Sequence, residues 1–193
     1  IIVTSDFGGS GILLITNNTI ADNGTGIIVE ACCDPLEVTG NRIHRNSGSA
    51  LSPKDDVSTP GTYRNNTITG GTEDQSFNMT LLNLYKFDGV FTGNNITLGA
   101  ETYIAHGDTS YSENALTDVE GNWWGTTDAS ALNALIYDWN DDVSETLLDF
   151  EPFLTAPNTT APPAPPTSVA AQTGPTTIAF TWDANTESDI TGY

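Results

Sequence analysis

One short pattern occurs five times in this chain: an apolar residue, two small or polar residues, Asn, any residue, then Ile or Trp. The repeated asparagines are Asn18, Asn41, Asn66, Asn94 and Asn122, and successive copies are 23, 25, 28 and 28 residues apart. Spacings of this size are typical of solenoids, and their unevenness excludes a heptad or a collagen-like repeat. We therefore expect an all-β coil of stacked rungs.

The asparagine of each copy lies two positions before the final apolar residue, so both side chains point to the same face of a strand. We expect this face to point into the core, where an amide without a hydrogen-bond partner is costly. The five asparagines are therefore predicted to stack as a structural ladder in which each amide bonds the next, and not to bind a ligand.

Acidic residues dominate the charge, with 25 Asp and Glu against five Lys and Arg and a formal net charge of −20. Such a surface repels nucleic acid and anionic membranes, so neither is an expected partner. The acidity fits solubility at high salt. Calcium binding is the alternative, but no stretch has the spacing of a calcium-binding loop, so no cofactor is predicted and calcium is a candidate without a motif.

The longest apolar runs are strand-sized, so no membrane insertion is predicted within these residues. The chain opens and stops in the middle of a pattern, from which we expect further domains of the same chain on both sides. Its two cysteines, Cys32 and Cys33, are adjacent. They are candidates for a vicinal disulfide, for a bond to another segment, or for free buried thiols, and they do not determine the compartment.

The sequence contains six N-x-Ser/Thr glycosylation acceptors, at Asn17, Asn23, Asn65, Asn78, Asn95 and Asn158. Asn17 and Asn65 each precede a ladder asparagine and Asn95 follows one, so strand alternation turns these three outward. Glycosylation at these positions is predicted to be sterically allowed, and it favours a surface glycoprotein of an archaeon or a eukaryote.

Residues 1–155 resemble right-handed parallel β-helix proteins. The resemblance is carried by the five repeats, by the expected strands that end at Val29 and His106, and by the segment from Gly121 to Leu154. The resemblance is to the pectin-lyase-like superfamily and its cell-surface relatives with short β-helix repeats. It implies a solenoid closed by a small C-terminal cap. Asp128 is suited to begin a helix in this cap, and Leu132, Leu135, Ile136 and Trp139 follow at helical spacing. Trp123 and Trp124 are expected to close the end of the core rather than stack on a ligand.

Residues 156–166 contain five prolines in eleven positions and predict an extended, semi-rigid Pro-rich linker. Residues 167–193 then resemble the beginning of a fibronectin type III domain, in which the position of Trp182 belongs to the core. Only part of such a seven-stranded sandwich is present, so the remainder is expected beyond Tyr193.

Enzymes with the β-helix fold place clustered carboxylates and a histidine in a groove, and the resemblance therefore raises the question of catalysis. The only weak catalytic candidates are Asp55, Asp56, His106 and Asp108. The motif series of pectin hydrolases is not reproduced, because an Asp pair is its only matching element. We therefore expect no catalytic site within these residues.

The sequence thus favours a non-catalytic extracellular or cell-surface module, structural or adhesive, within a larger modular glycoprotein of a surface layer, matrix or filament. Its partners are expected to be carbohydrate or other surface proteins, contacted by loops such as 31–37 and 47–61. The alternatives are a secreted polysaccharide lyase or glycoside hydrolase whose groove is completed by other residues, and a passive carbohydrate-binding module.

Overall fold

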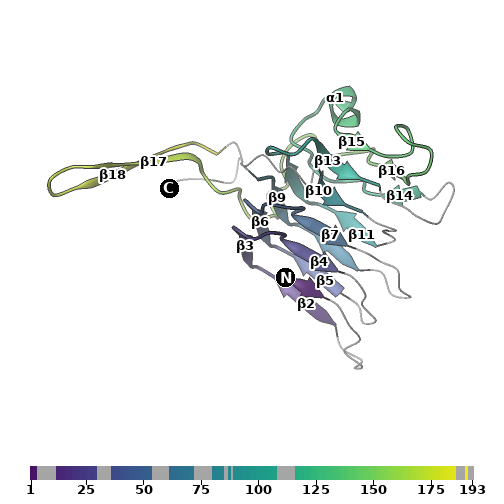
Figure 1. Cartoon of the computed structure of the whole chain (residues 1–193), viewed down its shortest axis with the longest axis horizontal. Coiled ribbons are helices and arrows are strands. Elements are labelled where there is room, and N and C mark those ends of the chain that lie inside the picture. Colours follow the sequence, from purple (N-terminus) through teal and green to yellow (C-terminus); the bar gives the residue numbers. More distant parts are fainter. Residues whose placement is uncertain are drawn as a thin grey trace.

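The computed structural model of the chain describes residues 1–3, 12–29, 36–53, 61–71, 80–84, 87, 89–107, 116–185 and 190. These residues form an all-β structure with several parallel sheets and one short helix (Figure 1). The Cys32–Cys33 pair, Asp55, Asp56, Asn78 and Asp108 lie outside the described residues.

The largest sheet has six parallel strands, and each of them except the last comes three elements after its neighbour in the chain. Its order is β1 (Ile2–Val3), β4 (Ile27–Val29), β7 (Leu51–Pro53), β10 (Thr80–Asn83), β13 (Tyr103–His106) and β15 (Ile136–Tyr137).

Two further parallel sheets of four strands each repeat the same order. One contains β2 (Leu13–Thr16), β5 (Leu36–Thr39), β8 (Thr62–Arg64) and β11 (Val90–Thr92); the other contains β3 (Thr19–Ala21), β6 (Arg42–His44), β9 (Thr67–Thr69) and β12 (Asn95–Thr97). The chain visits the three sheets in turn and returns to the first, as expected for a β-helix-like solenoid. We call one such circuit a rung.

Equivalent apolar residues of successive rungs stack in register and form the core. Ile20, Ile43, Ile68 and Ile96 pair across β3, β6, β9 and β12, and all four are buried. Full burial of each such side chain stabilises the fold by about 1.5–3 kcal/mol. The repeated Ile of the sequence pattern therefore forms one of the apolar stacks that connect successive rungs.

Two predicted loops contain strands. Leu36 and Glu37, expected at the end of loop 31–37, belong to β5, and Leu51–Pro53, expected within loop 47–61, is β7. Leu51 pairs with Ile27 on one side and with Leu82 on the other and is fully buried. The prediction of exposed loops was wrong at these residues, because the turn-forming residues beside each short strand favoured a loop in the sequence.

The C-terminal end of the stack contains the only helix among the described residues, α1 (Ala129–Asn133). Asp128 begins it, and its side chain accepts hydrogen bonds from the main-chain N–H groups of Ser130 and Ala131 at 3.0 and 3.1 Å. Two more parallel strands, β14 (Leu116–Asp118) and β16 (Leu147–Asp149), pair beside it.

The helical spacing of Leu135, Ile136 and Trp139 was misleading, because α1 ends at Asn133. Ile136 instead lies in β15, where it pairs with Ala105 of β13 and is buried. Sheet pairing thus overrides a local helical pattern. Trp124 is buried in the core, whereas Trp123 is half-buried and forms an isolated bridge with Asn95.

Beyond residue 166, β17 (Thr167–Thr173) and β18 (Ile178–Asp183) form an antiparallel hairpin that projects away from the parallel sheets (Figure 1). Every residue of both strands is exposed, and Trp182 retains 41% of its accessible surface. The core position expected for Trp182 stays a prediction, because the part of the chain that the structure describes contains the hairpin and not the rest of a sandwich. No helix of that part is long and apolar enough to cross a membrane.

Candidate functional site

The five repeated asparagines form one continuous line of side-chain amides. Nδ2 of Asn18, Asn41, Asn66 and Asn94 donates to Oδ1 of the next asparagine at 3.1, 3.0, 2.9 and 2.9 Å. The main-chain N–H of each donor residue bonds the same oxygen. The last four members are fully buried, and their amides are occupied by these bonds, so they link rungs and are not accessible to a ligand.

The residue before each ladder asparagine has a positive φ: 56° at Asn17, 66° at Gly40, 53° at Asn65, 69° at Gly93 and 69° at Gly121. Only glycine and, to a lesser degree, asparagine adopt this left-handed conformation readily. The alternation of Asn and Gly at this place is therefore a backbone requirement. It also explains the residues Asn17 and Asn65 without reference to glycosylation.

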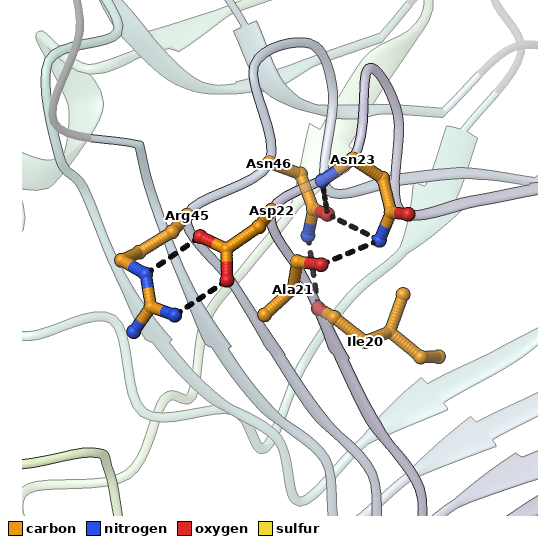
Figure 2. Close-up of polar contacts among 6 residues, drawn as sticks. All are labelled: Ile20, Ala21, Asp22, Asn23, Arg45 and Asn46. Atoms are coloured by element: carbon orange, nitrogen blue, oxygen red, sulfur yellow. Dashed lines mark hydrogen bonds and ion pairs between the residues drawn. The ribbon is translucent and has the colours of Figure 1, made fainter.

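A second amide step lies at another corner of the first two rungs (Figure 2). Nδ2 and the main-chain N of Asn23 donate to Asn46 Oδ1 at 3.2 and 3.1 Å, while Asn46 Nδ2 donates to the Ile20 carbonyl at 3.1 Å. Asn23 Nδ2 also donates to the Ala21 carbonyl at 2.8 Å. Asn23, which the sequence presents only as a glycosylation acceptor, thus has a structural role.

Asp22 and Arg45 precede these two asparagines and form a bidentate ion pair, with N–O distances of 2.9 and 2.6 Å (Figure 2). The hydrogen bonds from Arg45 hold the pKa of Asp22 below its ordinary value. Both side chains are exposed, so water and salt screen the pair, and its contribution to stability is small.

The same corner of the following rungs is held by a carboxylate. Glu101 is 6% exposed, and its two oxygens accept the main-chain N–H groups of Gly71 and Gly99 at 2.7 and 2.9 Å. A Cβ at Gly99 would lie 2.2 Å from the Gly71 carbonyl oxygen. Glycine is therefore required here for two backbone segments to approach each other, and Glu101 replaces the amides of the earlier rungs.

The residues best suited to contact a ligand come from β13, from β15 and from the segment just before β16. His106 Nε2 is 3.4 Å from Glu145 Oε1, and the His106 ring lies 5.2 Å from the ring of Tyr137. The Tyr137 ring lies a further 5.2 Å from that of Tyr103. Partial desolvation, with smaller contributions from nearby charged groups, raises the pKa of Tyr137 above its ordinary value. We call these four residues the tyrosine–histidine cluster.

This cluster combines aromatic faces, which stack on the C–H face of a sugar ring, with a histidine and a carboxylate that bond hydroxyl groups. Of the sequence-predicted catalytic candidates, the structure describes His106, and His106 belongs to this cluster. Glu145 and the tyrosines carried no sequence motif. Their juxtaposition depends on the parallel pairing of His106 with Tyr137, which a single sequence does not specify.

Residues 156–166, hereafter the strap, lie against the outer face of β6, β9 and β12. The Arg42 Nε donates to the Pro163 carbonyl at 2.8 Å, and the Thr67 hydroxyl donates to the Pro162 carbonyl. A cleft of about 260 Å³ remains between this face and the end of the strap, lined by Thr67, Thr97 and Trp123. The segment expected as a linker is thus attached along the rungs.

The glycosylation acceptors differ in exposure. Asn17 and Asn23 are exposed, and Asn65 and Asn158 are half-buried. Asn95 is only 6% exposed, because the strap covers the side chain that strand alternation turns outward.

Among the described residues, no group of three or more His, Cys, Asp or Glu side chains is placed to hold a metal ion. The Asp142 side chain accepts two hydrogen bonds from Ser144, which lower its pKa and mark it as a turn-forming residue. Comparisons of this chain with protein-family models, curated proteins and solved structures find no match.

Proposed function

We propose that this chain is a non-catalytic structural or adhesive module of an extracellular or cell-surface protein, part of a larger modular glycoprotein. In this proposal residues 1–155 are a right-handed parallel β-helix with a C-terminal cap, and residues 167–193 begin a fibronectin type III domain. The apolar side chains that the hairpin exposes, among them Val169 and Phe180, support a role as the first strands of a larger sandwich.

The observation that carries the proposal is the continuous amide ladder. Each of its members joins two rungs through side-chain and main-chain bonds, and Asn41, Asn66, Asn94 and Asn122 are completely buried. Such bonds resist separation of the rungs along the stack, since pulling them apart would leave buried amides without partners. A rigid rod of this kind suits a stalk that displays its surface in a surface layer, matrix or filament. Its net charge of −20 suits an exposed, hydrated position.

A carbohydrate-binding role is the second candidate, and the tyrosine–histidine cluster favours it. Tyr103 and Tyr137 present neighbouring half-exposed rings, and the His106–Glu145 pair lies at their side. If the module is adhesive, the tyrosine–histidine cluster is the expected contact. The same pair is the acid–base group that a polysaccharide-active enzyme would require.

One set of assays distinguishes these functions. The protein is incubated with pectate, alginate and polygalacturonate, and unsaturated and reducing ends are measured by ultraviolet absorbance and a reducing-sugar assay. The proposal predicts no turnover. Turnover that is lost in His106→Ala would replace it with the enzyme alternative.

Binding without turnover, measured by titration calorimetry and weakened in Tyr137→Ala, would select the adhesive form of the module. Val143→Ala is the matched control, because Val143 is exposed and lies outside the cluster.

A further inference from the structure

Three glycosylation acceptors that lie far apart in the sequence meet in one cluster. The main-chain N–H of Asn158 donates to Asn95 Oδ1 at 2.7 Å, and Asn95 Nδ2 donates to the Asn158 carbonyl at 3.0 Å. Asn158 Nδ2 donates to Asn65 Oδ1 at 3.0 Å and to the Gly93 carbonyl at 2.5 Å. The strap is therefore fastened to the rungs at the side-chain amides where sugars would be attached.

The rest of the strap depends on this attachment. Four of its residues after position 161 are prolines, which lack an N–H and cannot extend a sheet as a paired strand. Pro162 and Pro163 only accept hydrogen bonds, from Thr67 and Arg42. Among the contacts described here, the strap both donates and accepts hydrogen bonds with the same rung residue only at the reciprocal pair of Asn95 and Asn158.

Glycosylation is incompatible with these bonds. Nδ2 attacks C1 of a sugar carried on a lipid-linked phosphate; the C1–O bond breaks, the phosphate leaves with the electron pair, and Nδ2 loses a proton. A glycosylated asparagine therefore retains only one N–H. Asn158 uses both of its Nδ2 hydrogens. Asn95 uses one of its hydrogens and is 6% exposed, so the strap occupies the place of a sugar ring.

We propose that docking of the strap and N-glycosylation of Asn95 or Asn158 are mutually exclusive. A glycan at either position holds the strap away from β6, β9 and β12, uncovers the cleft at Thr67 and Trp123, and releases the hairpin β17–β18 from its anchor. The docked, unmodified chain anchors the base of the hairpin beside the rungs, whereas the modified chain carries it on a free proline-rich tether. The inference rests on the proposed surface glycoprotein role only for the source of the sugar.

The experiment attaches the sugar chemically. Asn95→Cys is made in a Cys32→Ser, Cys33→Ser background, coupled to N-iodoacetylglucosamine in urea, and refolded. Hydrogen exchange of the strap amides, including those of Asn158 and Ala161, is then measured by mass spectrometry. The controls are the same variant with a free thiol, and the same sugar on Ser130→Cys, an exposed position of α1.

We expect the sugar at position 95 to accelerate exchange of the strap amides about tenfold or more beyond the free-thiol variant, which already lacks the Asn95 amide bonded to residue 158, while the Ser130→Cys control remains protected. Equal protection in the sugar-bearing protein and the controls would overturn the proposal. If Asn95→Cys does not refold, or if its free thiol already leaves the strap unprotected, Asn158→Cys carrying the same sugar decides. Residue 158 lies outside the rungs, and its main-chain atoms keep both bonds to the Asn95 side chain. Polysaccharide turnover would refute the proposed function but would leave this result unchanged, since the sugar does not come from the cell.

Discussion

Replacement of Asn66 by alanine tests the ladder at a fully buried position. In the structure, Asn66 Oδ1 accepts the main-chain N–H of Asn41 at 3.0 Å, and Asn66 Nδ2 donates to the Val38 carbonyl at 2.9 Å. Asn66→Ala removes these hydrogen bonds from the Asn41 N–H and from the Val38 carbonyl, at a position that water does not reach. Each buried polar group that loses its partner costs about 1–3 kcal/mol, so the free energy of unfolding should fall by about 2–6 kcal/mol.

Asn18→Ala is the matched control, because Asn18 occupies the same place in the repeat at the exposed end of the ladder. This substitution removes the side-chain hydrogen bond from residue 18 to Asn41 Oδ1. The oxygen still accepts the main-chain N–H of residue 18 and becomes accessible to water. The expected loss is about 0.5–1.5 kcal/mol. Both variants are measured by urea unfolding followed by circular dichroism, with the slope of each transition compared to verify a common unfolded state. Equal losses in the two variants would refute the reasoning, because burial would then not determine the cost.

Three further outcomes follow from other contacts. Burial lowers the pKa of His44, so near pH 6.5 the unfolded chain binds a proton at this residue that the folded chain does not bind. The free energy of unfolding should therefore fall as the pH decreases through 6.5 toward the lowered pKa. His44→Gln should reduce this dependence in urea titrations between about pH 7 and 5. Glu101→Gln leaves one acceptor for the N–H groups of Gly71 and Gly99, so it should cost about 1–3 kcal/mol in urea unfolding, and no loss would contradict the proposed bridging role. Arg45→Asn keeps a residue that tolerates the positive φ of 50°, and it should leave the urea midpoint unchanged; a clear decrease would show that the exposed ion pair matters.

The sequence predicts the parallel all-β architecture well, because each rung repeats the same inward pair. The Asn41 and Ile43 side chains share a strand face, and this two-residue relation recurs at every rung. The Asn23–Asn46 step was missed although its spacing of 23 residues equals that of Asn18 and Asn41, since it occurs in only two rungs.

Other features require contacts that a single sequence does not specify. The strap binds residues 63 and 93 positions away, and its proline content alone predicts an extended segment whether or not it is docked. The tyrosine–histidine cluster similarly needs the pairing of β13 with β15, and the helical spacing around Ile136 pointed away from that pairing. Local patterns therefore predicted the rungs, whereas contacts between distant segments created the candidate sites.

The most direct test of the central claim is the hydrogen-exchange rate of the asparagine side-chain NH₂ groups, measured by NMR. The buried, continuous ladder predicts that the NH₂ groups of Asn41, Asn66 and Asn94 exchange only through opening of the rungs and are among the slowest in the molecule. Exchange of these three groups as fast as that of exposed Asn18 would contradict the ladder, and with it the rigid module proposed here.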